Sequence, residues 1–131
     1  MVLWTGVAEA SAVVEVRDVA AAFASSVGFG GQALDDVRLA VSEAFSNAVM
    51  HAYDGIVSGA VEVFGAHENR RLEIRVVDHG TGMLPRAESP GLGIGLVMMA
   101  TVMDGLLVQC TPGGGTTIAM SLARQPTDDA P

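Results

Sequence analysis

The chain has 131 residues and a mass of 13.4 kDa, a size that is typical of one domain. Half of its residues are hydrophobic and 17% are charged, which excludes an intrinsically disordered chain. Fifteen acidic residues against seven basic ones give a net charge of −8. This excess argues against direct binding to nucleic acid, whose phosphates attract basic surfaces.

The basic residues and the cysteine content exclude further classes of function. All seven basic residues are arginines. A P-loop and a eukaryotic-type kinase site both need a lysine, so neither is present. The single cysteine, Cys110, has no partner for an internal disulfide, which fits a reducing compartment. The first residues carry no basic leader segment, and no apolar run reaches the roughly 18 residues that a membrane span needs. We therefore expect a cytoplasmic protein.

The first half of the chain is predicted to form one strand and two helices. Residues 2–8 read as a short strand, and the alanine-rich residues 11–27 carry apolar side chains at helical spacing. Glycines follow and break that helix. A second helix is predicted over residues 32–53. Its core stripe is Val37, Val41, Ala44 and Ala48.

The second half is predicted to form two β-hairpins separated by a loop and a helix. The strands of the first hairpin are residues 60–66 and 71–78, and those of the second are residues 105–111 and 116–122. Between the hairpins we expect a polar loop over residues 79–93 and a third helix over residues 94–103. Residues 123–131 read as a polar tail.

These elements predict one domain over residues 1–131, with its core in residues 2–122. Hairpins pair their strands antiparallel, so a doubly wound parallel sheet is excluded. We expect an α/β, two-layer sandwich in which three helices cover one face of a mostly antiparallel mixed sheet.

The first candidate motif, Glu43-Ala-Phe-Ser-Asn47, lies on the predicted second helix. Its four-residue spacing places the carboxylate and the carboxamide one turn apart on the same face. An amide oxygen can bind Mg²⁺ while a neighbouring carboxylate positions or deprotonates a nucleophile. The same spacing also occurs on solvent-exposed helix faces, so the pair alone does not establish a site.

The second motif, Asp78-His79-Gly80-Thr81-Gly82-Met83, follows a strand that is too apolar to be exposed. A carboxylate at a strand end can accept a hydrogen bond from the exocyclic amine of adenine, and the glycines let the backbone approach a flat ligand. The Met83 side chain can pack on the face of such a ring. A simple turn is the alternative.

The third motif contains Gly91, Gly93 and Gly95 and opens the predicted third helix. Its backbone N–H groups would attract a phosphate, although its spacing is not that of a dinucleotide-binding loop. A flexible hinge is the alternative. The fourth motif, residues 113–117 (GGGTT), is on its own only a hairpin turn.

Taken in this order, the four motifs resemble the N box, the two glycine boxes and the final Gly-Thr box of the Bergerat-fold, or GHKL, ATPases. The segments SEAFSNAVMHAY, DHGTGM, GLGIGLVMMATVMD and GGGTTIAMSL are similar to those of the small bacterial anti-sigma factor serine/threonine kinases. The resemblance covers residues 10–122. It implies the Bergerat ATP-binding fold, with ATP and Mg²⁺ as cofactors.

The resemblance also implies a role for each matching residue of the nucleotide site. Glu43 matches the general base that activates a serine hydroxyl, Asn47 the Mg²⁺ ligand, and Asp78 the residue that reads the adenine amine. Gly80 and Gly82 match the glycines beside the base.

Three further glycines and two other residues complete the resemblance. The glycines Gly91, Gly93 and Gly95 match the phosphate cradle between the lid and the helix. Thr116 matches the threonine of the last box, near adenine. Arg17 is similar to the arginine that these kinases present to their protein partners.

The implied function is an ATP-binding anti-sigma factor that phosphorylates a serine of an anti-anti-sigma protein and sequesters a sigma factor. A homodimer is compatible with it. One departure leaves alternatives open: the segment over residues 83–91 is short and has Arg86 as its only cation. The alternatives are an ATP-binding clamp that transfers no phosphate and the catalytic domain of a histidine kinase.

Overall fold

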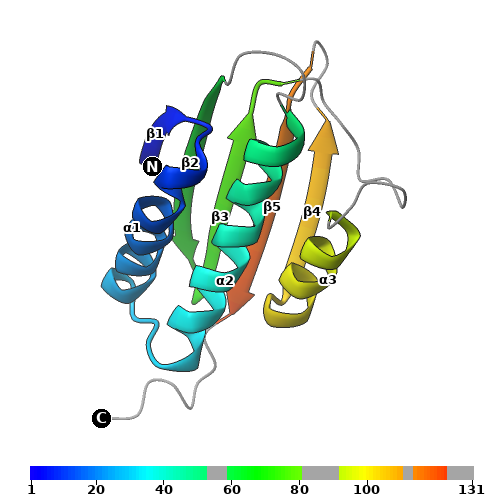
Figure 1. Cartoon of the computed structure of the whole chain (residues 1–131). Helices are drawn as coiled ribbons and strands as arrows, with labels where there is room; N and C mark the ends of the chain where they lie inside the picture. Colours follow the sequence, from blue (N-terminus) through cyan, green and yellow to red (C-terminus); the bar gives the residue numbers. More distant parts are fainter. Residues whose placement is uncertain (53–58, 81–91, 111–113, 124–131) are drawn as a thin grey trace.

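The computed structural model describes residues 1–52, 59–80, 92–110 and 114–123 (Figure 1). The strands are β1 (Val2–Val7), β2 (Ala60–Glu68), β3 (Arg71–Asp78), β4 (Gly105–Cys110) and β5 (Thr116–Ala123). The α-helices are α1 (Val13–Ser26), α2 (Gln32–Asn47) and α3 (Leu92–Val102). A 3₁₀ turn, η1 (Ala10–Ala12), precedes α1, and a π-helical segment, η2 (Ala48–Ala52), continues α2.

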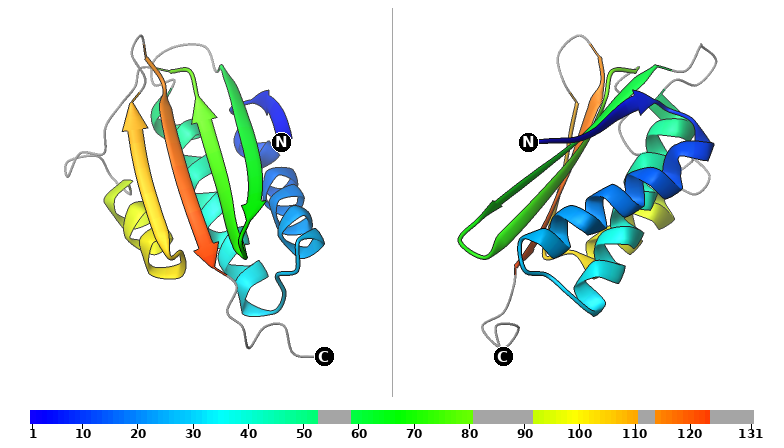
Figure 2. Two further views of the ribbon diagram at one scale, coloured as in Figure 1. Left: turned by 180° about the vertical axis from the view of Figure 1, so that it is seen from behind. Right: turned by 90° about the vertical axis from the view of Figure 1, so that its left-hand side faces the viewer.

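The strands form one five-stranded sheet in the order β1-β2-β3-β5-β4. All neighbouring pairs in it are antiparallel. The three α-helices cover one face of this sheet, and the edge-on view shows them as a single layer (Figure 2). The predicted two-layer sandwich is therefore confirmed, with a sheet that is antiparallel throughout the described residues.

The core lies between α2 and the middle of the sheet. The predicted stripe of α2 is buried: Val37 and Val41 expose none of their surface, and Ala44 and Ala48 expose at most 3%. Phe45 is also fully buried, and its ring meets that of Trp4 edge to face at 5.4 Å between centroids. Such an aromatic pair adds to the stability that burial provides.

Two boundaries differ from the predicted ones in ways that change the local structure. The α-helical part of α2 ends at Asn47, and the five residues after it widen into the π-helix η2. The first hairpin is longer than predicted, because β2 extends to Glu68 and pairs with Arg71. Only Asn69 and Arg70 are then left to turn the chain, and both have positive φ, 53° and 65°. Positive φ at both turn residues matches the right-handed twist of the strands that the turn joins.

Helix α3 is apolar around its whole circumference. Its Met99 and the nearby Met103 are buried in the core, whereas Ile94 and Val97 expose 69% and 66% of their surface. Its eleven residues are too few to cross a bilayer. None of the other helices in the described part of the chain has both the length and the apolar character for a membrane span.

Candidate functional site

The carboxylate of Glu43 and the amide of Asn47 meet at the start of α3. A Cβ atom on Gly95 would lie 3.0 Å from Glu43 Oε2 and 3.6 Å from Asn47 Oδ1. A side chain at this position would therefore displace the carboxylate by a few tenths of an ångström. The predicted one-turn spacing of Glu43 and Asn47 is confirmed, and both side chains face α3.

The amide of Asn47 has an unused donor. Its Nδ2 atom is buried and has no hydrogen-bond partner among the described residues. A buried polar group without a partner is costly and calls for an explanation, and a bound ligand supplies one. The Asn47 side-chain oxygen is a hard donor of the kind that Mg²⁺ prefers, and the Glu43 carboxylate lies beside it. The residues present thus fit a magnesium ion with a phosphate beside it.

Asp78 ends β3 with its side chain buried, 7% exposed. The backbone N–H groups of Gly80 and Thr116 both donate to its Oδ1 atom, at 3.1 and 3.2 Å. Thr116 stands directly opposite Asp78 in the β3–β5 ladder and is itself buried. Both of these bonds fall on Oδ1, so among the described residues the Oδ2 atom is left to accept from a donor such as the adenine amine.

Burial raises the pKa of the Asp78 carboxyl above its ordinary value of 3.8. The hydrogen bonds from Gly80 and Thr116 and the charge of His79 oppose this shift without cancelling it. A carboxylate whose charged form is destabilised by partial desolvation lowers the stability of the fold, and such carboxylates are common in functional sites.

Figure 1 shows the end of β3 and the start of β5 side by side at the upper end of the fold, with the last part of α2 in front of them. Helix α3 begins lower down, beside Glu43 and Asn47 of α2. Its first turn includes the amide groups of Gly93 and Gly95. The N-terminus of a helix favours phosphate because its N–H groups are free and its dipole is positive.

Three predicted site residues, Gly82, Met83 and Gly91, lie outside the described residues, as does Arg86. The other residues of the predicted nucleotide site are described. Arg17 is on α1 and is not part of this cluster. It lines a separate hollow of about 390 Å³ between α1 and α2, together with Asp35, Arg38, Leu39 and Ser42.

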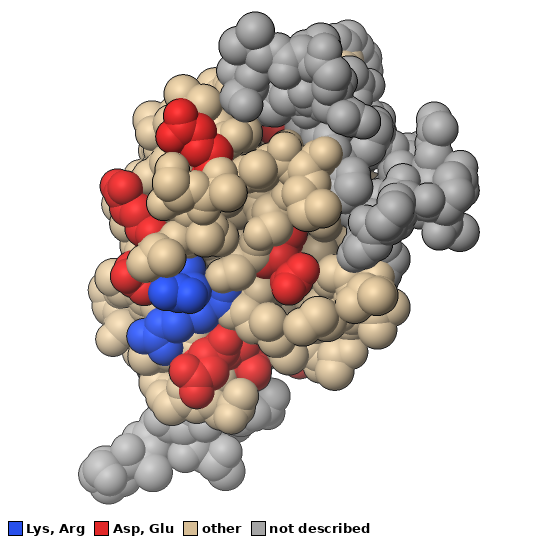
Figure 3. Space-filling model, in the orientation of Figure 1, with Lys and Arg blue, Asp and Glu red and all other residues tan. Residues whose placement is uncertain are grey.

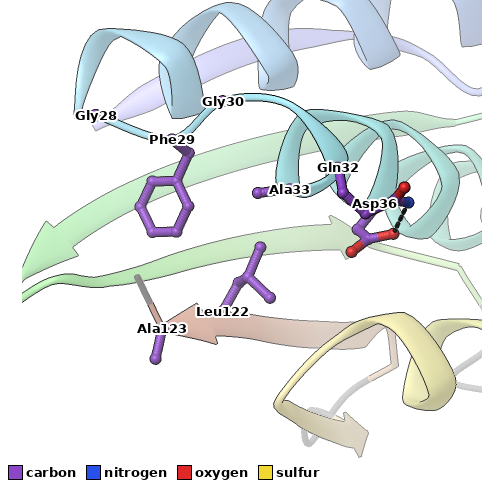
Figure 4. A pocket seen from close by; sticks show the side chains of 8 residues that line it. All are labelled: Gly28, Phe29, Gly30, Gln32, Ala33, Asp36, Leu122 and Ala123. Carbon is purple, nitrogen blue, oxygen red and sulfur yellow. Dashed lines mark hydrogen bonds between the residues drawn. The ribbon is translucent and has the colours of Figure 1, made fainter. Parts of the chain in front are cut away.

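A larger hollow of about 410 Å³ lies at the opposite end of the fold (Figure 4). It is formed at the start of α2 and the end of β5, with Phe29, Ala33 and Leu122 among its walls. On its rim, Gln32 Nε2 donates to Asp36 Oδ1 at 2.9 Å. None of the predicted nucleotide-binding residues lines it, so it is distinct from the candidate site.

Comparison with known proteins agrees with this geometry. The family model described as "Histidine kinase-like ATPase domain" matches residues 7–122. The chain belongs to this family. The solved histidine kinase domain of the E. coli osmosensor EnvZ has the same fold, with a TM-score of 0.50 and 19% identity over 95% of this chain and 91% of that one.

Two groups of relatives resemble the chain more closely in sequence. The anti-sigma F factor of Caldanaerobacter subterraneus is 34% identical, with 80% of each chain covered. The serine-protein kinase RsbW of Bacillus licheniformis is 35% identical, with 87% of this chain and 81% of the relative covered. The anti-sigma F factor of Clostridium acetobutylicum is 35% identical over 79% of this chain and 80% of the relative.

Some contacts of this histidine kinase-like ATPase domain could not be foreseen from the motifs. A Cβ on Gly114 would lie 2.7 Å from the carbonyl oxygen of Gly80, so the loops after β3 and before β5 touch through their backbones. Beside Asp78, His79 Nε2 lies 2.6 Å from Glu62 Oε1 on β2. The spacing of His79 and Glu62 in the sequence gives no signal, because the β2–β3 register alone brings them together.

We predict that Gly95→Ala separates stability from activity. The new methyl group meets Glu43 Oε2 at 3.0 Å, so the carboxylate must move, and small displacements of catalytic groups cost about 100-fold in rate. Alanine in place of glycine stabilises a helix by up to about 1 kcal/mol. The variant should therefore melt at or above the wild-type temperature while any phosphoryl transfer slows. Equal transfer rates in the two proteins would show that Glu43 is not held by this contact.

Proposed function

We propose that this chain is an ATP-dependent serine kinase that holds a sigma factor and phosphorylates a serine of an anti-anti-sigma antagonist. The relatives named anti-sigma F factor and serine-protein kinase RsbW support this role, at 33–35% identity over most of the chain. The observation that carries it is the convergence of Glu43, Asn47 and Gly95 at the start of α3. This convergence supports a role for Glu43 as a proton acceptor next to bound phosphate.

Asp78, Asn47 and Glu43 each have a separate role in the proposed reaction. Asp78 accepts a hydrogen bond from the adenine amine and so selects the nucleotide. Asn47 would hold Mg²⁺, which neutralises phosphate charge when bound. Gly93 and Gly95, with Gly91, Gly80 and Gly82, keep the backbone open around the phosphates and the base.

Glu43 acts on the incoming serine. The serine Oγ attacks the γ-phosphorus of ATP, the bond between that phosphorus and the oxygen bridging it to ADP breaks, and ADP leaves. The Glu43 carboxylate takes the hydroxyl proton as the new P–O bond forms. Because the transferred group arrives already activated, most of the catalytic effect comes from position and charge.

The same reaction gives a partner switch. A phosphoserine carries about −1.5 to −2 charges at neutral pH, and this chain carries a net charge of −8. The phosphorylated antagonist is therefore repelled, which leaves the chain free to hold the sigma factor. Since transcription takes place in the cytoplasm, the proposed role places the chain there.

Mg-ATP and Mg-ADP are expected to raise the melting temperature. Only the folded state brings Asn47, Asp78 and the start of α3 together, so nucleotide binds the folded state alone. At a hundred times its dissociation constant, it should add about 2.7 kcal/mol to the free energy of unfolding. Differential scanning fluorimetry measures the shift, with Mg-GTP as the control for base selection. If millimolar Mg-ATP leaves the melting temperature unchanged, the proposed nucleotide site is wrong.

A further inference from the structure

A tight turn follows β3 and is closed by the side chain of Asp78. The N–H group of Gly80 donates to Asp78 Oδ1 at 3.1 Å, so the side chain bonds the backbone two residues further on and forms an Asx turn. His79 is the middle residue of this turn. A movement of His79 would therefore displace one of the two donors that orient the Asp78 carboxylate.

His79 is attached to the neighbouring strand β2. Its Nε2 atom lies 2.6 Å from Oε1 of Glu62. Because a carboxylate only accepts hydrogen bonds, the imidazole donates from Nε2, which it can do as a neutral or as a charged ring. The distance is short, as in charge-assisted hydrogen bonds. The pair is called here the His79–Glu62 tether.

The tether and the base-reading carboxylate lie on opposite faces of the sheet. Asp78 and Val61, its partner in the β2–β3 register, are both buried, and Val61 belongs to the core under the helices. Successive side chains of a strand point to opposite faces, so Glu62 points to the face that the helices leave uncovered (Figure 2). Its bond with His79 is exposed there. The tether can therefore act on a nucleotide at Asp78 only through the backbone of the turn.

The same turn is held from the side of β5. The N–H group of Thr116 donates to Asp78 Oδ1 at 3.2 Å. A Cβ atom on Gly114 would lie 2.7 Å from the carbonyl oxygen of Gly80, and the φ of Gly114 is 109°, a conformation that favours glycine. Since β3 lies between β2 and β5, the turn is fixed by β5 on one side and by Glu62 on the other.

His79 is also the basic side chain that lies next to Asp78 in the described part of the chain. On the helical face, the basic atoms form one patch over α1 and α2 (Figure 3). Arg70 and Arg71 lie at the other end of β3, and Arg75 packs on the ring of Phe64 at 5.4 Å. The positive charge of His79 opposes the rise in the pKa of the Asp78 carboxyl that burial causes. The imidazole is therefore close enough to Asp78 to influence it.

We propose that His79 and Glu62 are positioning residues for adenine recognition. The tether holds the turn so that Gly80 keeps its bond to Asp78 Oδ1 and the Oδ2 atom is presented to the amine of the base. This inference rests on the proposed function, in which Asp78 reads adenine. It adds two residues that act on the nucleotide site without contact to the nucleotide, and one of them, Glu62, lies outside all four sequence motifs.

Loss of the tether should change nucleotide affinity more than stability. The side chains of His79 and Glu62 are 57% and 34% exposed, and such exposed pairs contribute little to the free energy of unfolding. A turn that can shift, however, weakens the hydrogen bond between Asp78 and the base. A hydrogen bond of this kind is worth about 3- to 10-fold in affinity.

The test compares variants of the full-length chain by calorimetric titration with Mg-ADP. Glu62→Ala and His79→Ala should each bind Mg-ADP about 3- to 10-fold more weakly than the wild type. The double variant should bind no more weakly than the single ones, because both changes remove the same bond. Glu62→Gln keeps an acceptor oxygen for His79 and should therefore retain most of the wild-type affinity.

Two controls separate positioning from a general effect on the fold. Glu73→Ala removes a carboxylate from the exposed side of β3, away from the turn, and should bind Mg-ADP like the wild type. Purine riboside diphosphate lacks the exocyclic amine of adenine and offers Asp78 no donor, so the wild type and Glu62→Ala should bind it equally. Without nucleotide, the melting temperatures of all variants should lie within a few degrees of the wild type.

Three results would overturn the tether. They are equal Mg-ADP affinity of Glu62→Ala and the wild type, losses in the two single variants that add in the double variant, and an equal loss of affinity for the analogue without the amine. Each of them, from a wild type that binds Mg-ADP, leaves the proposed kinase in place. A wild type that fails to bind millimolar Mg-ADP would reject the nucleotide site, and the role of the tether with it.

Discussion

Glu43→Gln is expected to slow phosphoryl transfer to the antagonist serine by about 10²- to 10⁴-fold. Glutamine keeps the size of the side chain and one acceptor oxygen beside Gly95, but it cannot take the hydroxyl proton. The affinity for Mg-ATP should change little, because Asn47 and Asp78 keep their contacts. The initial rate of transfer from γ-labelled ATP to the antagonist that co-purifies with the chain measures the effect.

The matched control for this variant is Glu73→Gln. It removes the same charge from the exposed face of β3, where Glu73 contacts only Arg75 among the ion pairs of the described residues. Its transfer rate should equal that of the wild type. Wild-type transfer by Glu43→Gln would mean that the chain is a kinase whose general base is another group.

Asp78→Asn is expected to weaken adenine nucleotide binding without weakening the fold. The asparagine oxygen can still accept both N–H groups, from Gly80 and Thr116, that now bond to Asp78 Oδ1. The NH₂ group then replaces Oδ2 and meets the adenine amine donor to donor. An unpaired polar group in a buried site costs about 1–3 kcal/mol, which corresponds to about 5- to 150-fold in affinity.

The direction of the pKa shift explains why the fold should tolerate this change. The pKa of the Asp78 carboxyl is raised by burial, so the folded state binds its proton more tightly than the unfolded state. The stability from this group is fully present below the unfolded pKa and is lost as the pH rises through the folded pKa. At neutral pH the charge therefore opposes folding, and Asp78→Asn should melt at or above the wild-type temperature.

Calorimetric titration with Mg-ADP, together with the melting temperature, measures both effects of Asp78→Asn. Asp18→Asn serves as the control, because it removes one charge from an exposed position on α1. Normal nucleotide affinity in Asp78→Asn would reject the base-reading role of this residue. Loss of both affinity and stability would instead show that Asp78 holds the β3–β5 junction together.

Local patterns in the sequence were sufficient to predict the layers of the fold. The apolar stripe of α2 and the alternation in the hairpin strands are both set by neighbouring residues, and the structure buries Val37, Val41 and Ile74 accordingly. The same locality explains why Glu43 and Asn47 could be placed on one face. The π-helix after Asn47 could not be predicted, because its residues have no period that differs from an α-helix.

These local sequence patterns could not predict contacts between segments that are far apart in the chain. The motifs identify Glu43 and Gly95 separately, but only the packing of α3 against α2 shows that the missing Cβ makes room for the carboxylate. The hollow beside Arg17 is lined by Arg38 from the next helix, so no local pattern brings these two residues together. The scarcity of basic residues was the one signal in the sequence that could have drawn attention to Arg38.

The proposed activity of this chain is transfer of the γ-phosphate of ATP to a serine of its antagonist. The most direct test incubates the purified chain with γ-labelled Mg-ATP and the co-purified antagonist, and then locates the label by peptide mass spectrometry. We predict label on an antagonist serine with the wild type and almost none with Glu43→Gln. Label on a histidine would contradict the claim in favour of a histidine-kinase activity. No label at all, from a chain that binds Mg-ATP and holds its partner, would contradict it in favour of a clamp.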